Sequence, residues 1–139
     1  MIRIREIDHV VLRVRNLQEM LDFYCNALGC KIEKQLTESG LIQLRAGNSL
    51  IDLVSVDSKL GRTGGKPPGT EGLNMDHVCF RVNPFNPDGI AEHLSRYGIE
   101  VGETATRYGA EGFGPSIYVC DPDGNTLELK GPPETATPT

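Results

Sequence analysis

IDHVVLRV at residues 7–14 and MDHVCFRV at residues 75–82 are two copies of one strand-like pattern, and they decide the fold. Aspartate, histidine, valine, arginine and valine match in register between the two copies. Each copy is followed by a stretch with helical spacing and then by three further strand-like stretches. The sequence therefore predicts two βαβββ modules in tandem.

The predicted helix of each module begins after an asparagine and ends at a glycine. Asn16 has Glu19 three residues later, which resembles a capping box, and Gly29 ends the first helix. Asn86 precedes a proline suited to the first helical position, and Gly98 ends the second helix. Both helices carry apolar residues at helical spacing, so each can pack one face on a sheet.

The remaining strands are expected near residues 31–36, 41–46 and 49–56 in the first module and near 99–107, 115–121 and 125–130 in the second. The modules cover about residues 5–57 and 75–130, a Gly- and Pro-rich linker covers 58–74, and residues 131–139 are expected to be a flexible tail. Residues 1–130 then form a single α+β domain. In it, the two modules build a curved eight-stranded mixed sheet around a cavity, with the helices outside.

Composition narrows the class of protein. With 38% hydrophobic and 24% charged residues in 139, the chain can bury a core and stay soluble. A net charge of −5 argues against a nucleic-acid partner, and no apolar run is long enough for a membrane span. The start has no signal peptide, so a cytoplasmic protein is expected. Four cysteines without paired spacing are expected to be reduced, with Cys79 and Cys120 in core strands.

Polar residues recur on one face of the repeated strand. Because strand side chains alternate between faces, His9 and Arg13 lie opposite the apolar residues that face the helices. His77 and Arg81 occupy the same places in the second copy. This repetition predicts that both histidines face the cavity.

The last strand of each module adds an acid on the same face. In SLIDLVSV the acid is Asp52, and in NTLELKG it is Glu128. Two carboxylates in one cavity repel each other and are costly to desolvate, and a divalent cation removes both problems. His9, Asp52, His77 and Glu128 are therefore predicted to bind a metal ion. The alternative is that the histidines are structural and the acids pair with the two arginines.

These segments, together with LDFYCNALG and the closing DPDGNTLEL at 121–129, resemble the vicinal oxygen chelate superfamily of glyoxalase I, bleomycin-resistance proteins and extradiol dioxygenases. The resemblance implies paired βαβββ modules around a metal cavity. By position, His9, His77 and Glu128 match family metal ligands. Asp52 stands where bacterial glyoxalase I has Glu, so it ligates with changed geometry, acts through water, or does not ligate.

The resemblance also implies a function. It suggests a glyoxalase I-like lyase or isomerase, in which Glu128 is the catalytic base and Zn, Ni, Co, Mn or Fe stabilises an enediolate. Arg13 matches an arginine that binds a glutathione carboxylate, or else it neutralises the acids, while Val56 replaces an asparagine expected for glutathione. The alternatives are a non-haem iron dioxygenase using His9, His77 and Glu128, and a non-catalytic ligand-binding or resistance protein. The partners implied are a small oxygen-chelating substrate and a second copy in a homodimer.

Overall fold

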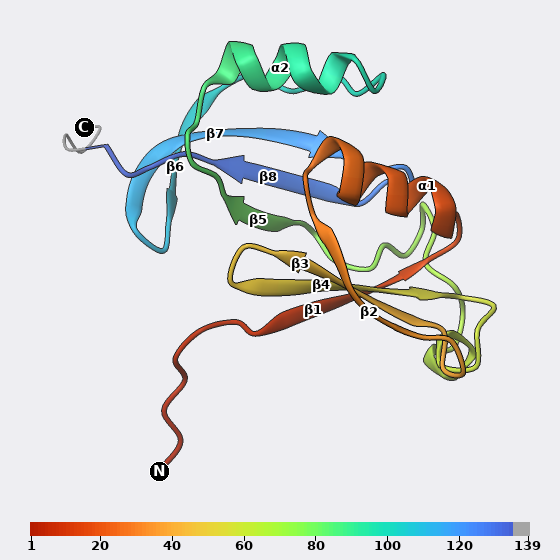
Figure 1. The fold of residues 1–139 in the computed structure, drawn as a ribbon. Helices are drawn as coiled ribbons and strands as arrows, with labels where there is room; N and C mark the ends of the chain where they lie inside the picture. The colour runs from red at the N-terminus through yellow and green to blue at the C-terminus, as the bar shows by residue number, and fades with distance from the viewer. Residues whose placement is uncertain (135–139) are drawn as a thin grey trace. The chain divides into compact units, whose positions relative to one another are not determined.

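The computed structural model describes residues 1–134. The chain divides into two compact units, with the boundary in the sequence between Asn74 and Met75. The first unit contains β1 (His9–Val14), α1 (Leu17–Leu21), the π-helical segment η1 (Asp22–Ala27), β2 (Lys31–Leu36), β3 (Leu41–Ala46), β4 (Ser49–Ser55) and the 3₁₀ turn η2 (Gly61–Gly64). The second contains β5 (Val78–Arg81), α2 (Pro87–Ser95), β6 (Ala105–Gly109), β7 (Gly112–Cys120) and β8 (Thr126–Lys130) (Figure 1). The predicted tandem βαβββ organisation is confirmed.

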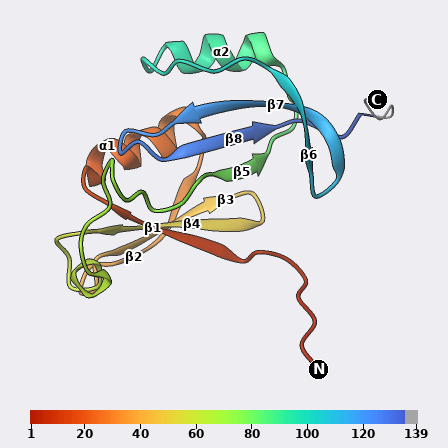
Figure 2. The same ribbon diagram turned by 180° about the vertical axis from the view of Figure 1, so that it is seen from behind.

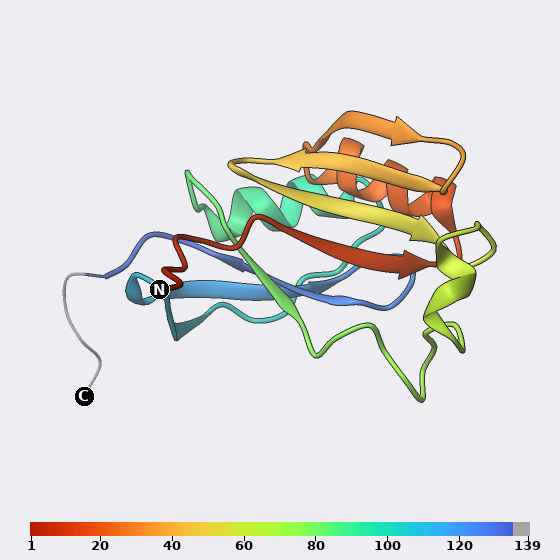
Figure 3. The ribbon, with the colours of Figure 1, turned by 90° about the horizontal axis from the view of Figure 1, so that it is seen from below.

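Each unit has its own four-stranded mixed sheet. The strand order is β1-β4-β3-β2 in the first and β5-β8-β7-β6 in the second, so the eight strands form two sheets of equal topology. Figure 3 shows β1 (red) beside β4 (yellow), and Figure 2 shows β5, β8 and β7 side by side. The first and last strands of each unit pair in parallel, and the other pairs are antiparallel. This pairing sets the strand that begins with histidine beside the strand that carries the acid.

The core of the first unit lies between its helical segment and one face of its sheet. Met20 and Tyr24 of this segment are fully buried, as are Leu44 and Leu53 of the sheet, and α1 contacts β4. Burying a side chain of this size contributes roughly 1.5–3 kcal/mol. In the second unit the corresponding core residues are Leu94, Ile117, Val119, Leu127 and Leu129.

The helix boundaries agree with the sequence except at one cap. Gly29 (φ 78°) and Gly98 (φ 73°) follow the helical segments in the left-handed region, as expected of helix-ending glycines. The side chain of Asn86 accepts a hydrogen bond from the N–H of Gly89 at 3.1 Å and caps α2. The capping box predicted at Asn16 is wrong. With ψ at 72°, its backbone is outside the extended region that such caps adopt, and its side chain makes no cap hydrogen bond.

Most of residues 108–114, which separate two of the expected strands, are part of the sheet instead. β6 starts at Ala105, later than expected, and β7 starts at Gly112, earlier than expected. The two strands pair from Ala105 opposite Ser116 to Gly109 opposite Gly112, which leaves a short hairpin turn. Glycines are poor strand formers, so local propensity underestimated this pairing.

Two further expectations need revision. The N–H of Gly131 donates to Pro115 and that of Glu134 donates to Phe113, so residues 131–134 run along β7. Residues 135–139 of the expected tail lie outside the described residues. All four cysteines are free thiols, but Cys79 and Cys120 are exposed because they lie on the sheet face away from the apolar core.

No helix among the described residues is long and apolar enough to cross a membrane.

Candidate functional site

In the first unit, a buried carboxylate lies on the strand beside the one that carries His9. Val11 pairs with Asp52, so His9, two residues earlier, projects from the same face of the sheet. Asp52 is only 1% exposed. Its Oδ2 accepts a hydrogen bond from Nε2 of Gln43 at 3.3 Å, while its buried Oδ1 has no hydrogen-bond partner among the described residues. A buried carboxylate with a free oxygen calls for a cation.

His9 is oriented by the residue before it. Its Nδ1 lies 2.7 Å from Oδ1 of Asp8, which leaves Nε2 for a ligand. The hydrogen bond to Asp8 raises the pKa of His9 above its ordinary value, with a smaller contribution from the charge of Asp52, while desolvation acts in the opposite direction. An imidazole whose second nitrogen is held by a carboxylate is the usual arrangement of a metal-binding histidine.

The second unit repeats this arrangement. Nδ1 of His77 lies 2.5 Å from Oδ2 of Asp76, and Nε2 of His77 lies 3.4 Å from Oε1 of Glu128. With Nδ1 held by Asp76, Nε2 is the ring nitrogen that faces the Glu128 carboxylate, so both groups are placed to bind the same cation.

Glu128 is 6% exposed and is flanked by two groups that hold their protons. Cys79 on β5 and Tyr118 on β7 are its register neighbours. Although the Cys79 residue is partly exposed, desolvation of its thiol and the nearby Glu128 carboxylate raise the pKa of Cys79 to about 11. Desolvation and the hydrogen bond with Glu128 likewise raise the pKa of Tyr118. Both side chains therefore stay neutral at pH 7 and can donate to the Glu128 carboxylate.

The two arginines do not neutralise these acids. The guanidinium of Arg13 donates to four backbone carbonyls of one loop, those of Gly61, Gly64, Gly65 and Lys66, at 2.7–3.3 Å. Arg81 donates from Nε to Glu111 at 2.8 Å and from Nη1 to the carbonyl of Val82. The alternative in which the arginines pair with Asp52 and Glu128 is therefore not what the structure shows.

The donor set of each unit fits a divalent metal, since each supplies one imidazole and one carboxylate. Within residues 1–134 no group of three or more histidine, cysteine and acidic side chains is spaced to hold a metal ion. The sequence-based prediction missed Asp8 and Asp76, which orient the two histidines. The signal was present, because the Asp-His dipeptide occurs in both copies of the repeated strand.

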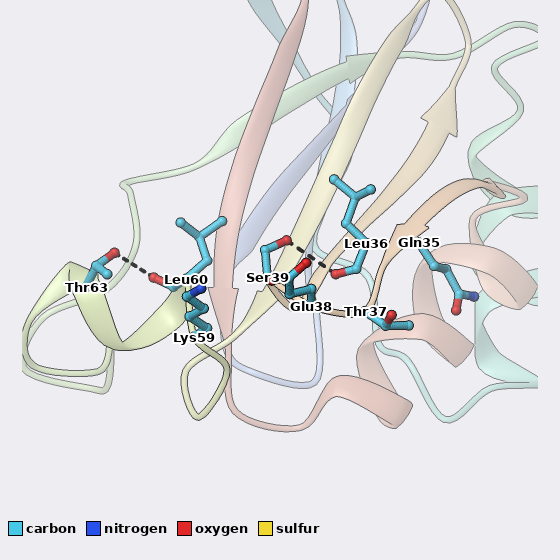
Figure 4. A pocket seen from close by; sticks show the side chains of 8 residues that line it. All are labelled: Gln35, Leu36, Thr37, Glu38, Ser39, Lys59, Leu60 and Thr63. Atoms are coloured by element: carbon cyan, nitrogen blue, oxygen red, sulfur yellow. Dashed lines mark hydrogen bonds between the residues drawn. The ribbon is translucent and has the colours of Figure 1, made fainter.

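A pocket of about 570 Å³ in the first unit lies away from these groups. It lies at the turn between β2 and β3 and beside the segment before η2 (Figure 4). Its lining residues are Gln35, Leu36, Thr37, Glu38, Ser39, Lys59, Leu60 and Thr63. The hydroxyls of Ser39 and Thr63 donate to the carbonyls of Leu36 and Leu60, so they stabilise local turns. None of the predicted site residues lines this pocket.

Comparison with known proteins identifies relatives along almost the whole chain. The chain is 33% identical over 131 residues to the glyoxalase domain-containing protein RDO1 of Mycosarcoma maydis, covering 91% of this chain and 68% of that protein. It is 25% identical over 124 residues to catechol-2,3-dioxygenase of Bacillus subtilis (strain 168), covering 88% of this chain but only 40% of the dioxygenase.

A third relative is the virulence protein STM3117 of Salmonella typhimurium, 32% identical over 129 residues, which cover 91% of this chain and 83% of that protein. Its crystal structure has a TM-score of 0.74 to this structure at 28% identity, covering 94% of this chain and 98% of that one. The sequence model of one family matches residues 6–129. The chain therefore belongs to the Glyoxalase/Bleomycin resistance protein/Dioxygenase superfamily.

Proposed function

We propose that this protein is a divalent-metal-dependent lyase or isomerase of the glyoxalase I type, with His9, Asp52, His77 and Glu128 as the metal ligands. The observation that carries the proposal is the buried Asp52 carboxylate, whose Oδ1 has no partner among the described residues. A dioxygenase triad of two histidines and one carboxylate has no use for a second acid, whereas a four-ligand site does. Family membership supports metal chemistry in general.

A bound metal would compensate the buried Asp52 carboxylate, whose Oδ1 has no partner among the described residues. Zn, Ni, Co, Mn and Fe all accept two imidazoles and two carboxylates, and none of these requires a thiolate. When bound, such an ion withdraws electron density from substrate oxygens and makes the neighbouring C–H more acidic. The aspartates next to the two histidines hold each imidazole with Nε2 directed away from its Asp partner.

Glu128 is the residue that moves the proton in this proposal. Its carboxylate accepts a proton from the carbon beside the substrate carbonyl and returns it at the neighbouring carbon. Tyr118 and Cys79 stay protonated beside it and donate to the carboxylate, so they hold its orientation. A base that is 6% exposed is shielded from bulk water, which protects the abstracted proton from exchange.

The test is turnover of methylglyoxal with glutathione by protein loaded with Ni²⁺ or Zn²⁺. We expect loss of turnover in Glu128→Gln, which keeps the shape and removes the base. Glu111→Gln is the matched control, because Glu111 is a half-exposed acid of the same unit paired with Arg81. Turnover in Glu128→Gln equal to that of the unchanged protein would remove Glu128 from the reaction, and no turnover with any metal would remove the lyase.

Arg13 has a smaller part in this proposal than its family position implies. Binding a substrate carboxylate would require its guanidinium to give up bonds to the loop carbonyls of residues 61–66. Its Nε is buried without a partner among the described residues. Comparing KM for glutathione adducts in Arg13→Lys with that of the unchanged protein tests a role in substrate binding.

A second candidate function is an iron-dependent dioxygenase. The similarity to a catechol-2,3-dioxygenase favours it, and so does the closeness of His77 to Glu128. Oxygen consumption with catechol under Fe²⁺ that survives Asp52→Asn would support this candidate over the lyase. If adding Ni²⁺, Zn²⁺ or Fe²⁺ to the metal-free protein leaves its stability unchanged, a non-catalytic binding protein is favoured instead.

We further propose a homodimer. All six residues of the edge strand β2 are exposed, including the apolar Ile32 and Leu36, and an uncovered sheet edge can pair with a second copy. Light scattering coupled to size exclusion measures the mass in solution, and a mass equal to that of one chain would exclude the dimer.

A further inference from the structure

Lys130, at the end of β8, is a buried cation without an acidic partner among residues 1–134. It is 6% exposed, and its Nζ donates to the backbone carbonyl of Arg107 at 2.8 Å. No ion pair joins it to a carboxylate of residues 1–134. An ammonium has three N–H donors, so one bond to a carbonyl leaves both the charge and two donors uncompensated.

Two glycines make room for this lysine. A Cβ added at Gly109 would lie 2.7 Å from Cε of Lys130, and a Cβ added at Gly114 would lie 2.9 Å from its Nζ. Both distances are too short for real atoms, so any larger residue at either position would displace the side chain. The glycines in β6 and β7 thus let the ammonium reach the carbonyl of Arg107.

Arg107 is a second cation that no acid of the described residues pairs with. Its guanidinium stacks on the ring of Tyr118, with Cζ 4.5 Å from the ring centroid. Nη1 donates to the carbonyl oxygen of Ser116 at 2.8 Å and to its hydroxyl at 2.9 Å. The other guanidinium N–H groups form no hydrogen bond with the described residues, so they remain able to bind an anion.

The register places both cations on the same face of the sheet as Glu128. Tyr118 pairs with Glu128 and Ser116 pairs with Lys130, while Arg107 pairs with Gly114. Directly paired residues share a face, and residues two apart on a strand share it as well. Glu128 and Lys130 are two residues apart, which is roughly 7 Å along a strand. A small organic acid spans that distance.

We propose that Lys130 and Arg107 form an oxyanion subsite, which binds a carboxylate or phosphate group of the substrate while Glu128 acts on a carbon further along the same molecule. An oxyanion supplies the counter-charge that the buried ammonium lacks, and the guanidinium offers it further N–H donors. The assignment of this group to the substrate rests on the proposed function. The subsite itself lies entirely in the second unit and stands without it.

The experiment titrates EDTA-treated, full-length protein with inorganic phosphate and, separately, with acetate, followed by the amide signals of Gly109 and Gly114 in ¹H–¹⁵N NMR. We expect saturable shifts with one or both anions, and the tighter one names the substrate's group. Losing one charge-assisted contact in Lys130→Met or in Arg107→Gln should weaken binding by about tenfold to a hundredfold. Arg96→Gln is the matched control, because it removes an exposed charge at the C-cap of α2 that pairs with Glu92.

Saturable binding that both variants weaken and Arg96→Gln retains supports the subsite. Absence of saturable shifts with either anion, or equal affinity in all variants, overturns it. Because Lys130 is buried, Lys130→Met could unfold, and Arg107→Gln then decides alone, since its side chain is only partly buried. No metal is present in this titration, so a failed lyase assay with intact anion binding refutes the proposed function alone. Turnover without anion binding refutes only the subsite.

Discussion

Replacing Asp52 by asparagine should stabilise the metal-free protein and weaken its response to metal. The substitution keeps the shape, and the remaining oxygen can still accept from Gln43, which lies 3.3 Å from Oδ2. It removes a negative charge that is 1% exposed and has one oxygen without a partner among the described residues. Relief of that desolvation should raise the free energy of unfolding by about 1–2 kcal/mol. For a chain of this size, Tm should rise by roughly 3–8 °C.

Adding metal should reverse which of the two proteins, the unchanged one or Asp52→Asn, is the more stable. At a free metal concentration of about 100 Kd, the unchanged protein gains about 2.7 kcal/mol. If loss of the Asp52 ligand weakens binding about a hundredfold, the variant at the same concentration gains only about 0.4 kcal/mol. The unchanged protein is then the more stable of the two by roughly 0.3–1.3 kcal/mol, although it is the less stable without metal.

The assay is thermal unfolding followed by circular dichroism, after EDTA treatment and again with Ni²⁺ or Zn²⁺. Asp57→Asn is the control, because Asp57 is exposed just after β4 and its loss changes the net charge equally. Equal metal-induced shifts in the Asp52→Asn variant and the unchanged protein would refute the ligand role. A metal-free variant less stable than the unchanged protein would show that the carboxylate is compensated.

Two further predictions follow from local contacts. Gly64→Ala would place a Cβ 2.6 Å from Cζ of Arg13, so it should displace the guanidinium. We expect the free energy of unfolding to fall by about 1–3 kcal/mol and the loop to become sensitive to protease. Gly72→Ala, which has open space around it, should change neither the stability nor the protease sensitivity. Asp8→Asn should lower the pKa of His9 toward its ordinary value, as an NMR titration of the metal-free protein would show. Because the folded-state pKa is raised, the stability that His9 contributes is complete below pH 6.5 and is lost as the pH rises through the raised pKa. An unchanged His9 titration in Asp8→Asn would contradict the Asp8 hydrogen bond as the cause.

Much of the fold could be predicted from the sequence because the patterns that specify it are local. The two copies of the Asp-His strand, the alternation around Asp52 and Glu128, and the glycines after the helices all act within a few residues. The failures were local too. The Asn16 cap does not form, since the backbone there has ψ at 72°. The glycine-rich residues near 108–114 pair as a hairpin although glycine is a poor strand former, so residue propensity alone did not predict them.

By itself, then, the sequence determined the two modules and which side chains share a face with the histidines, since a two-residue period and turn chemistry need no distant partner. Only the tertiary structure decided what each charged group is bonded to. Arg13 binds loop carbonyls about fifty residues away. Among the described residues, Oδ1 of Asp52 has no partner, and Lys130 is buried beside Arg107 with no acid paired to it. These outcomes depend on strand register and on how the chain folds back on itself, and no short stretch of sequence specifies either.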